Sequence, residues 1–568
     1  MFAANNYLLI EPEGTGSNQE IPMALVKKTL KAWLTPILIL FAQATPALAQ
    51  TTHYVAPRGA SITCAGNLGD ATCPFSSVNA ALTSGLVEGG NTLLLMDGVH
   101  DRIVITGRSF STPVAIQSRN LHQAAVETIH MDNTSGFTFR NLKVYATPDI
   151  PFPLARFNAD TSYISLDGML MQSTANVDDV LLWNYDEWRA RRRFGVWLYG
   201  SNSKMINSTV KAVKSGIWSN GRNNQVINNQ ITELTGDGLR GGSDTVISGN
   251  YVANFMLVDD DHLDGFQAIG TISGLVLSEN RIFEWTHADG HPLQASIQGI
   301  GMFDGFYDDF LIQNNIVSVS AYHGIAVYGG RGGRIVNNTV IHRSGNSEKF
   351  PWIGIFNHKN GTPSNNIVVA NNLAMAFSGN SYTNNVVLTD NSVVLYPDTV
   401  FQDVAGFDYR LKADSPLIDS ANPLYAPSID IDGHARPFGA GPDMGAFEFW
   451  DSSKHPIKTD TSQETQLDPE PAPIEEEIAD SVPDTEYEPY ESTDEAAPDD
   501  DLLIEENTKP VRLRSRWTDG ALPGGSNSKR LLSTSEDAQD DDLLIEENTT
   551  SVRLWNGWTG RALRSTSN

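Results

Sequence analysis

The chain has 568 residues, of which 40% are hydrophobic and 19% are charged, so it can supply a sizeable core. Its formal net charge of −29, from 39 basic and 68 acidic residues, argues against a nucleic-acid-binding protein, which needs cations to replace phosphate counterions. No apolar run in the sequence reaches the ~18 residues needed to span a bilayer. Two cysteines exclude a disulfide-dense scaffold and a cysteine-rich zinc site.

The first 49 residues are predicted to contain an export signal. Three lysines within residues 27–31 precede a mostly apolar run over residues 32–41, and residues 46–49 place small side chains before a cleavage site. This order is typical of a secretory signal peptide. We therefore expect translation to start at Met23, the mature chain to start near Gln50, and the protein to be secreted or periplasmic.

The two cysteines are Cys64 and Cys73. Export places them in an oxidising compartment, which favours a disulfide that closes a short loop. Two free thiols are the alternative.

Two short phrases recur through the middle of the chain. An apolar–Asn–apolar phrase has its second Asn at Asn229, Asn250, Asn280, Asn315, Asn338 and Asn372. A phrase of Gly followed by alternating apolar residues starts at Gly195, Gly216, Gly238, Gly265, Gly299, Gly324 and Gly354. Because no amphipathic helix separates these strand-like phrases, a βαβ sheet is excluded and a solenoid of short parallel strands is predicted. Its Asn positions are expected to stack as structural ladders inside the turns.

Further segments flank the repeats. The leading ones are Tyr54–Gly59, Pro74–Leu82 and Gly89–Gly98, and the trailing ones are Ser415–Asp419, Asp430–Gly433, Arg436-Pro437 and Asp443–Glu448. With the repeats, they resemble the pectate-lyase-like superfamily of right-handed parallel β-helices over roughly residues 52–450. The resemblance implies an all-β solenoid domain over residues 50–450 with an N-terminal capping helix. The fold hosts several chemistries, so the reaction has to be argued from the site.

The Gly phrases predict which side chains face outward. The residue after each glycine is expected to point inward, and the second residue after it outward. The predicted inward set is Val196, Ile217, Leu239, Phe266, Ile300, Ile325 and Ile355; the outward set is Trp197, Trp218, Arg240, Gln267, Gly301, Ala326 and Phe356. The residues just before the glycines form a second row, with four consecutive polar rungs at Asp237, Asp264, Gln298 and His323. Aromatic, Arg, Asp, His and Gln side chains on one face are typical of a saccharide groove.

The densest phrase runs from Asp259 to Gln267. A carboxylate beside an imidazole keeps the charge of that imidazole tunable near neutral pH. We therefore predict His262 and His323 for proton transfer, with Asp264 orienting an imidazole; a solvated loop before a strand is the alternative. The predicted substrate-binding residues are Trp197, Trp218, Asp237, Arg240, Gln267, Gln298, Tyr328, Arg331, His358 and Lys359. A plain surface pair is the alternative for the last two.

These residues suit the cleavage of an acidic polysaccharide by β-elimination. A cation or hydrogen-bond donor neutralises the uronate carboxylate, a base takes the neighbouring proton, and an acid protonates the leaving oxygen. The resemblance supports a polysaccharide lyase, since many enzymes of this fold are lyases. The alternatives are a uronate C5-epimerase, a glycoside hydrolase that uses two of Asp237, Asp264 and Asp304, and a non-catalytic polysaccharide-binding or adhesin-like solenoid.

No metal or cofactor is assigned with certainty. The run Asp259–Asp261 supplies oxygen ligands suited to calcium, which some enzymes of the fold use. An exposed acidic turn is the alternative.

The chain after residue 450 differs in composition. Residues 459–500 contain sixteen Asp and Glu and no Lys or Arg, so residues 451–498 are predicted to be a disordered linker. In residues 499–568 the segment Asp499–Thr508 recurs unchanged as Asp540–Thr549, an offset of 41. We expect this tail to bind a cell surface or an export partner; a drifting duplication is the alternative.

Overall fold

The computed structural model describes residues 50–147, 153–259, 262–344, 350–380 and 385–450, and the backbone of three strands between residues 530 and 556. Two predicted segments, the export signal in residues 1–49 and the linker over residues 451–498, lie outside the described residues.

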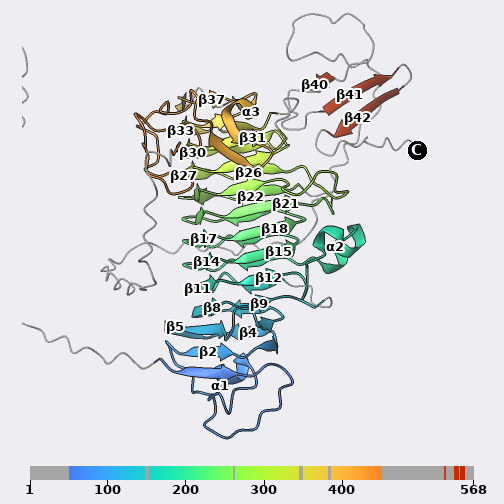
Figure 1. Cartoon of the computed structure of the whole chain (residues 1–568), viewed down its shortest axis with the longest axis vertical. Coiled ribbons are helices and arrows are strands. Elements are labelled where there is room, and N and C mark those ends of the chain that lie inside the picture. Colours follow the sequence, from blue (N-terminus) through green and yellow to red (C-terminus); the bar gives the residue numbers. More distant parts are fainter. Residues whose placement is uncertain are drawn as a thin grey trace, which may run out of the picture. The chain divides into compact units, whose positions relative to one another are not determined.

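Three long parallel sheets make up the fold, and each turn of the chain adds one strand to each sheet (Figure 1). Sheet A consists of β1 (Thr52–Val55), β2 (Thr92–Leu95), β5 (Ser109–Ser118), β8 (Ser135–Arg140), β11 (Ser162–Asp167), β14 (Lys204–Ile206), β17 (Gln225–Ile227), β20 (Val246–Ser248), β24 (Val276–Ser278), β27 (Tyr307–Gln313), β30 (Gly330–Val336), β33 (Asn365–Ala370) and β36 (Val386–Thr389), with β23 (Ile272–Ser273) beside β27.

Sheet B consists of β3 (Gly98–His100), β6 (Ala124–Val126), β9 (Lys143–Val144), β12 (Leu170–Gln172), β15 (Thr209–Val213), β18 (Gln230–Leu234), β21 (Tyr251–Phe255), β25 (Arg281–Phe283), β28 (Ile316–Val319), β31 (Thr339–His342), β34 (Leu373–Ala374) and β37 (Ser392–Val393). Sheet C consists of β4 (Ile103–Thr106), β7 (Ile129–Asp132), β10 (Ala155–Phe157), β13 (Val196–Leu198), β16 (Ile217–Ser219), β19 (Leu239–Gly241), β22 (Asp264–Ile269), β26 (Gln298–Asp304), β29 (His323–Tyr328), β32 (Trp352–Phe356) and β35 (Ala376–Gly379). The predicted fold class, an all-β right-handed parallel β-helix, is confirmed.

The core lies inside the coil, between the three sheets. All seven residues predicted to point inward from the Gly phrases are buried there, as are their counterparts in sheets A and B. Strand alternation sends every second side chain into this core, and the β-branched residues of the phrases suit such a surface. The intervening side chains of sheet C therefore face outward.

A ladder of buried asparagines runs through the turns between sheets A and B. In each step the amide Nδ2 of one Asn donates to Oδ1 of the Asn one rung later, from Asn229 to Asn250 at 3.0 Å and from Asn280 to Asn315 at 3.0 Å. The ladder continues through Asn338 and Asn372 with amide distances of 2.9 Å. The predicted Asn ladder is confirmed. Its side chains are used for structure and leave the chemistry to other residues.

Helices are short and sit outside the coil. Helix α1 (Val78–Thr83) is capped by Ser77, whose hydroxyl accepts from the amide of Ala80 at 3.0 Å, and its buried side chains join the core beside the first strands. Helix α2 (Tyr185–Arg191) starts with a capping box between Asn184 and Glu187. A 3-10 turn, η1 (Val180–Leu182), precedes α2, and α3 (Pro397–Val400) follows sheet B.

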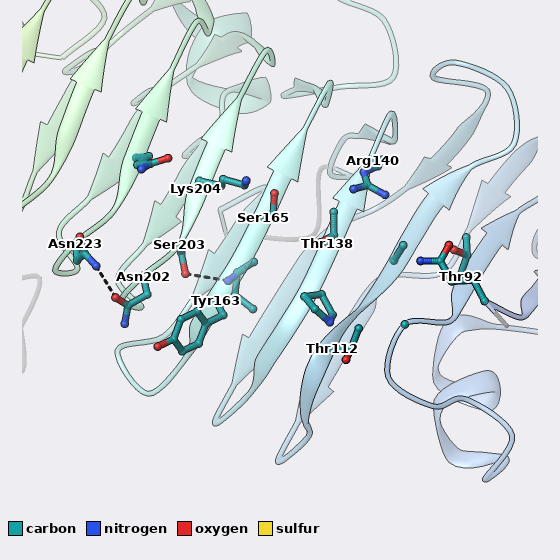
Figure 2. A pocket seen from close by; sticks show the side chains of 16 residues that line it. Thr92, Thr112, Thr138, Arg140, Tyr163, Ser165, Asn202, Ser203, Lys204 and Asn223 are labelled. Atoms are coloured by element: carbon teal, nitrogen blue, oxygen red, sulfur yellow. Dashed lines mark hydrogen bonds between the residues drawn. The ribbon is translucent and has the colours of Figure 1, made fainter. Parts of the chain in front are cut away.

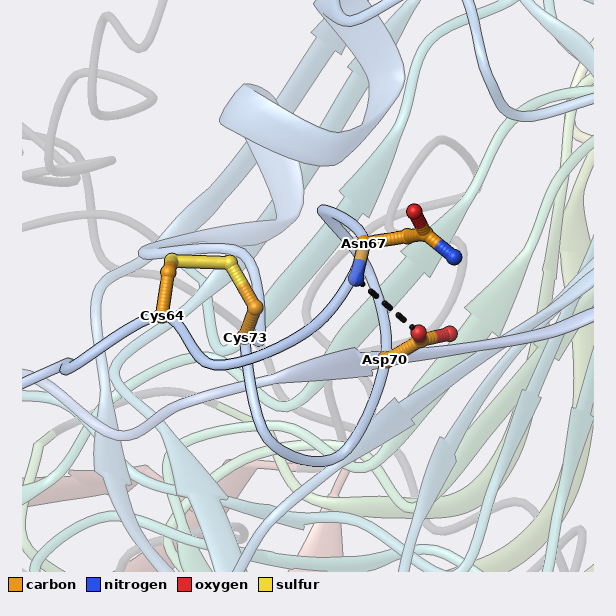
Figure 3. Close-up of a disulfide and its surroundings, with 4 residues drawn as sticks. All are labelled: Cys64, Asn67, Asp70 and Cys73. Atoms are coloured by element: carbon orange, nitrogen blue, oxygen red, sulfur yellow. Dashed lines mark hydrogen bonds between the residues drawn. A yellow bond between two sulfur atoms is a disulfide. The ribbon is translucent and has the colours of Figure 1, made fainter.

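Cys64 and Cys73 form a disulfide in the loop between β1 and α1 (Figure 3). The loop is also held by a hydrogen bond from the backbone N–H of Asn67 to Asp70 Oδ2 at 3.1 Å.

The trailing segments pack against the outside of the solenoid. A two-stranded antiparallel sheet of β38 (Phe401–Asp403) and β39 (Asp408–Leu411) contributes Phe401 and Tyr409 to a second apolar cluster, which includes Phe283 of sheet B. Nearby, the buried Arg436 donates to the Asp443 carbonyl at 2.8 Å and to Glu448 Oε2 at 3.2 Å. These charged groups are held by each other and by backbone groups, as buried charges must be.

Part of the duplicated tail has a described backbone. In the second copy, β41 (Leu543–Asn548) pairs antiparallel with β42 (Ser551–Asn556) and with β40 (Arg530–Leu532). The first copy lies outside the described residues. Within the described ranges, no helix has the length and apolar character to cross a membrane.

Candidate functional site

The outward face of sheet C carries one continuous row of side chains. Strand register places the following residues one rung apart: Val104, His130, Arg156, Trp197, Trp218, Arg240, Gln267, Gly301, Ala326 and Gly354. Adjacent parallel strands lie about 4.8 Å apart, so each side chain lies over its neighbour. The register follows the predicted order from Trp197 to Ala326.

The predicted row is wrong at the last Gly phrase. Gly354, and not Phe356, pairs with Ala326, so the register there is two residues away from the alignment by glycine. The register shifts between His323 and Ile325, and His323 pairs with Trp352, where alignment by glycine had placed Ile353. Trp352 was therefore missed as a site residue.

A second row, at the start of the sheet C strands, brings four predicted polar residues together. The backbone amide of Asp264 donates to Asp237 Oδ1 at 3.2 Å, and Asp264 pairs in register with Gln298. Gln298 Oε1 lies 2.7 Å from His323 Nδ1. All four side chains are buried. This set, Asp237, Asp264, Gln298 and His323, is called the polar row below.

Asp264 is the most unusual member of the polar row. Its residue is 1% exposed, and neither carboxyl oxygen has a hydrogen-bond partner in the described part of the chain. Burial, and next the negative charge of Asp237, raise the pKa of Asp264 well above its usual range, and Arg240 offsets only part of this effect. The carboxyl group is therefore protonated at pH values where other aspartates are ionised. No hydrogen bond joins it to either histidine, so the predicted role of orienting an imidazole has no direct contact behind it.

Arg240 connects the polar row to the aromatic end of the face. Its Nε and Nη2 donate to Asp237 Oδ2 at 3.0 and 2.7 Å, and its guanidinium lies 3.9 Å from the centre of the Trp218 ring. The other side of Trp218 faces Trp197, whose ring is parallel at 5.9 Å. Both faces of the Trp218 indole thus have protein neighbours, which leaves its edge rather than a face for a sugar.

His323 is surrounded by aromatic rings. The rings of Tyr322, Trp352 and Phe303 lie 4.4, 4.8 and 5.2 Å from its centre. Burial, and next the charge of His262, lower the pKa of His323 to about 3, so its imidazole is neutral across the physiological range. His262 is exposed and lies close enough to affect the pKa of His323. The two predicted histidines are therefore brought together.

Glycines shape the aromatic part of the face. A Cβ atom at Gly301 would lie 2.3 Å from the Phe303 ring, so this ring can fold back over the strand only because residue 301 has no side chain. Phe303 then reaches Tyr328 at 5.5 Å, and Tyr328 stacks on Phe356 at 4.7 Å. Tyr328 is almost fully buried in this stack.

Three predicted substrate-binding residues lie apart from the polar row: Arg331 at the start of strand β30 in sheet A, and His358 and Lys359 in the loop after β32. Arg331 makes two 2.7 Å hydrogen bonds to Asp308, and its guanidinium lies 4.5 Å from the Phe306 ring centre. His358 stacks on Phe306 at 4.2 Å. Lys359 pairs with Asp304 at 2.8 Å. The two cations of this group already have carboxylate partners.

Of the possible calcium ligands Asp259–Asp261, only Asp259 lies in the described part of the chain. Asp259 pairs with Arg192 at 2.6 Å and lies 3.7 Å from Lys214, which are cations rather than further oxygen ligands. Residues 260 and 261 lie outside the described residues. No group of three or more His, Cys, Asp or Glu able to hold a metal occurs within the described ranges.

Sequence reasoning missed the end of the face that precedes Trp197. There a cavity of about 170 Å³ is lined by Arg102, His130 and Arg156 among others. Arg156 also lies 5.7 Å from the Trp197 ring centre. These strands lack the Gly phrase, so the sequence offered little indication of them. The alternation of apolar and polar residues in Ile129–Asp132 and Ala155–Phe157 was the one pattern that could have placed His130 and Arg156 on the outward face.

The sheets and the ladder define the chain as a right-handed parallel β-helix protein. Residues 168–340 match a family model described as a right handed beta helix region. Among solved structures, the chain is similar to pectate lyase Pel9A, with 16% identity, a TM-score of 0.39 and coverage of 70% of this chain and 97% of that one. It is also similar to the A-module of the Azotobacter vinelandii mannuronan C-5 epimerase AlgE6, with 11% identity, a TM-score of 0.35 and coverage of 56% and 92%.

A further similar structure is a mannuronic acid specific polysaccharide family 6 lyase from human gut microbiota, with 14% identity and a TM-score of 0.31. That likeness covers 55% of this chain and 80% of the lyase. At these identities the likenesses concern the fold alone. The search of curated proteins found no match.

Proposed function

We propose that the outward face of sheet C binds an acidic polysaccharide and cleaves it by β-elimination next to a uronate unit. The observation that carries this proposal is the pair of histidines, one exposed and one buried with a lowered pKa, two rungs from a buried carboxyl group whose pKa is raised. Action outside the cytoplasm, predicted from residues 1–49, agrees with a polymeric substrate.

His262 is the proposed base, because it is the exposed imidazole of the pair and can reach a bound polymer. His323 is the buried member of the pair, and its Nδ1 donates to Gln298 Oε1. A neutral His323 adds no second positive charge to the site, so it does not oppose the transfer of a proton to His262.

The charges of the polar row suit an anionic substrate. Asp237 is matched by Arg240, and a protonated Asp264 adds no negative charge. An ionised Asp264 would repel a uronate carboxylate through a poorly solvated region, where charges interact strongly. Arg156 supplies positive charge along the same face, where an extended polymer crossing successive rungs would pass it, whereas the charge of Arg240 is offset by Asp237.

The test uses the full chain with polygalacturonate, alginate and a neutral polysaccharide. Elimination leaves an unsaturated uronate that absorbs ultraviolet light, so rising absorbance together with new reducing ends on one acidic polymer is the expected result. The variant His262→Ala is expected to abolish it, while His122→Gln, a histidine outside sheet C whose Nε2 contacts the Gly168 carbonyl, is expected to keep at least half of the rate. Full activity of the His262→Ala variant would refute the assigned base.

A second candidate, glycoside hydrolysis, is favoured by one observation. Asp237 is bound to Arg240, whereas the adjacent Asp264 has a raised pKa, and two carboxyl groups held in different charge states are the usual acid and base of such enzymes. Hydrolysis predicts reducing ends without new absorbance, and loss of that activity in the variants Asp264→Asn and Asp237→Asn. The same two assays therefore separate the candidates.

A further inference from the structure

The outward face of sheet A contains a cavity of about 580 Å³, away from the residues of sheet C discussed above. Its floor follows one row of register partners on successive strands: Thr92, Ala115, Thr138, Ser165, Lys204 and Gln225. Five steps of about 4.8 Å make this floor about 24 Å long. The cavity is thus shaped for an extended chain rather than for a compact molecule.

Hydroxyl and amide groups dominate the lining (Figure 2). Thr112, Thr138 and Ser165 lie along the strands, and Asn202 and Asn223 lie at the rim, joined by a hydrogen bond of 2.7 Å from Asn223 Nδ2 to Asn202 Oδ1. Such groups pair with the hydroxyls of a saccharide. A hydrophobic ligand would leave them without hydrogen bonds and is disfavoured.

The cavity is also positively charged. Arg140 and Lys204 both line it and both are exposed, and no carboxylate lines it. Neither cation forms an ion pair within the described part of the chain; the carboxylate of Asp167, the register partner of Arg140, accepts from Asn207 at 3.0 Å. In a chain of net charge −29, two exposed cations that line one cavity and form no ion pair in the described part of the chain favour an anionic ligand.

Tyr163 adds an aromatic surface at the rim (Figure 2). It is 63% exposed, and its backbone has a φ of 54°, in the left-handed region that aromatic residues rarely adopt. The same turn position has a positive φ at Asn202 and Asn223 on the next rungs, so this conformation belongs to the repeat, and it is the exposure of the Tyr163 ring that suggests a ligand. An exposed phenol ring beside hydroxyls and amides is suited to the apolar face of a sugar ring.

We propose that this cavity is a second binding site, specific for an acidic oligosaccharide segment of the polymer. The identity of the polymer rests on the proposed function, but the site itself rests on the lining of sheet A. Arg140 and Lys204 bind the carboxylates, the hydroxyls and amides bind the ring hydroxyls, and Tyr163 contacts a ring face. By holding one part of a long chain, the site increases the effective concentration of other parts at sheet C.

The test measures binding of a purified acidic oligosaccharide to the full chain by calorimetry, in a His262→Ala background that prevents turnover. The double variant Arg140→Gln and Lys204→Gln is expected to lose one class of sites or to weaken it about tenfold. Tyr163→Ala is expected to weaken the same class. The matched control is Lys211→Gln on sheet B, which removes one positive charge and is expected to change nothing.

Two results would overturn the proposal: unchanged binding in the double variant, or equally tight binding of a neutral oligosaccharide of the same length. Circular dichroism and thermal unfolding establish that each variant is folded. Because the measurement needs no cleavage, it remains decisive if sheet C proves inactive. If sheet C is active, the double variant with His262 intact is expected to keep its rate on short oligomers within about twofold and to lose rate on long polymers.

Discussion

The neutral state of His323 has a measurable effect on stability. Its pKa falls from the usual 6.5 to about 3 in the folded chain, so between these values the unfolded chain binds a proton that the folded chain does not. This contribution is complete above pH 6.5 and is lost as the pH falls. At about 1.4 kcal/mol per pH unit, lowering the pH from about 7.5 to about 4.5 should cost about 3 kcal/mol from this residue alone.

The assay compares the full chain with the variant His323→Gln by urea denaturation at the two pH values. Glutamine retains a donor for Gln298 Oε1 but does not titrate, so the stability difference between the two proteins isolates the imidazole. We expect this difference to shift by about 3 kcal/mol in favour of the variant at the lower pH. A variant of a histidine outside sheet C, His122→Gln, measures the general effect of removing an imidazole.

A shift below about 0.5 kcal/mol would refute the reasoning, since it would mean that solvent reaches His323 and keeps its pKa near the usual value. Adding His262→Ala tests the second cause. Without the charge of His262, the pKa of His323 should rise and the shift should become smaller.

Three further predictions concern stability. The variant Asp264→Asn should gain stability relative to the unmodified chain as the pH rises above about 4. The raised pKa of Asp264 in the folded state lowers the free energy of unfolding of the unmodified chain by up to about 1.4 kcal/mol per pH unit in that range. A stability difference that stays constant with pH in denaturation experiments would contradict this. The variant Arg240→Gln should lower the free energy of unfolding by about 2 kcal/mol, because it leaves Asp237 buried without its cation. Its control is Lys359→Gln, which breaks an exposed ion pair and should lower the free energy of unfolding by less than about 0.5 kcal/mol. The variant Asn280→Ala should lower the free energy of unfolding by about 3 kcal/mol, since it leaves the ladder groups of Asn250 and Asn315 without their partner. The control is Asn79→Ala at an exposed position. Equal melting temperatures for the two variants would count against the ladder as a source of stability.

The fold could be predicted because its signals are local and repeated. The ladder positions from Asn229 to Asn372 and the inward residues of the Gly phrases each recur once per rung, so one error does not alter the pattern. The exception was the phrase at Gly354, where the register differs from the alignment by glycine and places Trp352 beside His323. A sequence pattern gives spacing along the chain, but it does not reveal a bulge.

The candidate site was predictable only in part. The row that contains Asp237, Asp264 and His323 followed from aligning the Gly phrases, because each of these residues stands just before the glycine of its phrase. The ion pairs could not be predicted in this way. Arg331 and Lys359 pair with Asp308 and Asp304, and the alternation of residues along a strand does not specify contacts with another strand. The cavity on sheet A was missed because its hydroxyls and amides look like an ordinary solvated surface until their curvature is known.

The asparagine ladder also gives the solenoid a direction. Every amide in it donates toward the next rung along the chain, from Asn229 through to Asn391, so the side-chain dipoles add along the axis and each bond polarises the next. Each rung is held mainly by the rungs directly before and after it, as in other stacked repeats, and local opening therefore begins where one neighbour is lacking. The strands next to the polar row, β19 to β29, are flanked in sheet C by five strands on the N-terminal side and by β32 and β35 on the other. Fraying of either end would leave these rungs intact, so a shortened solenoid could keep its chemistry after it has lost its ends.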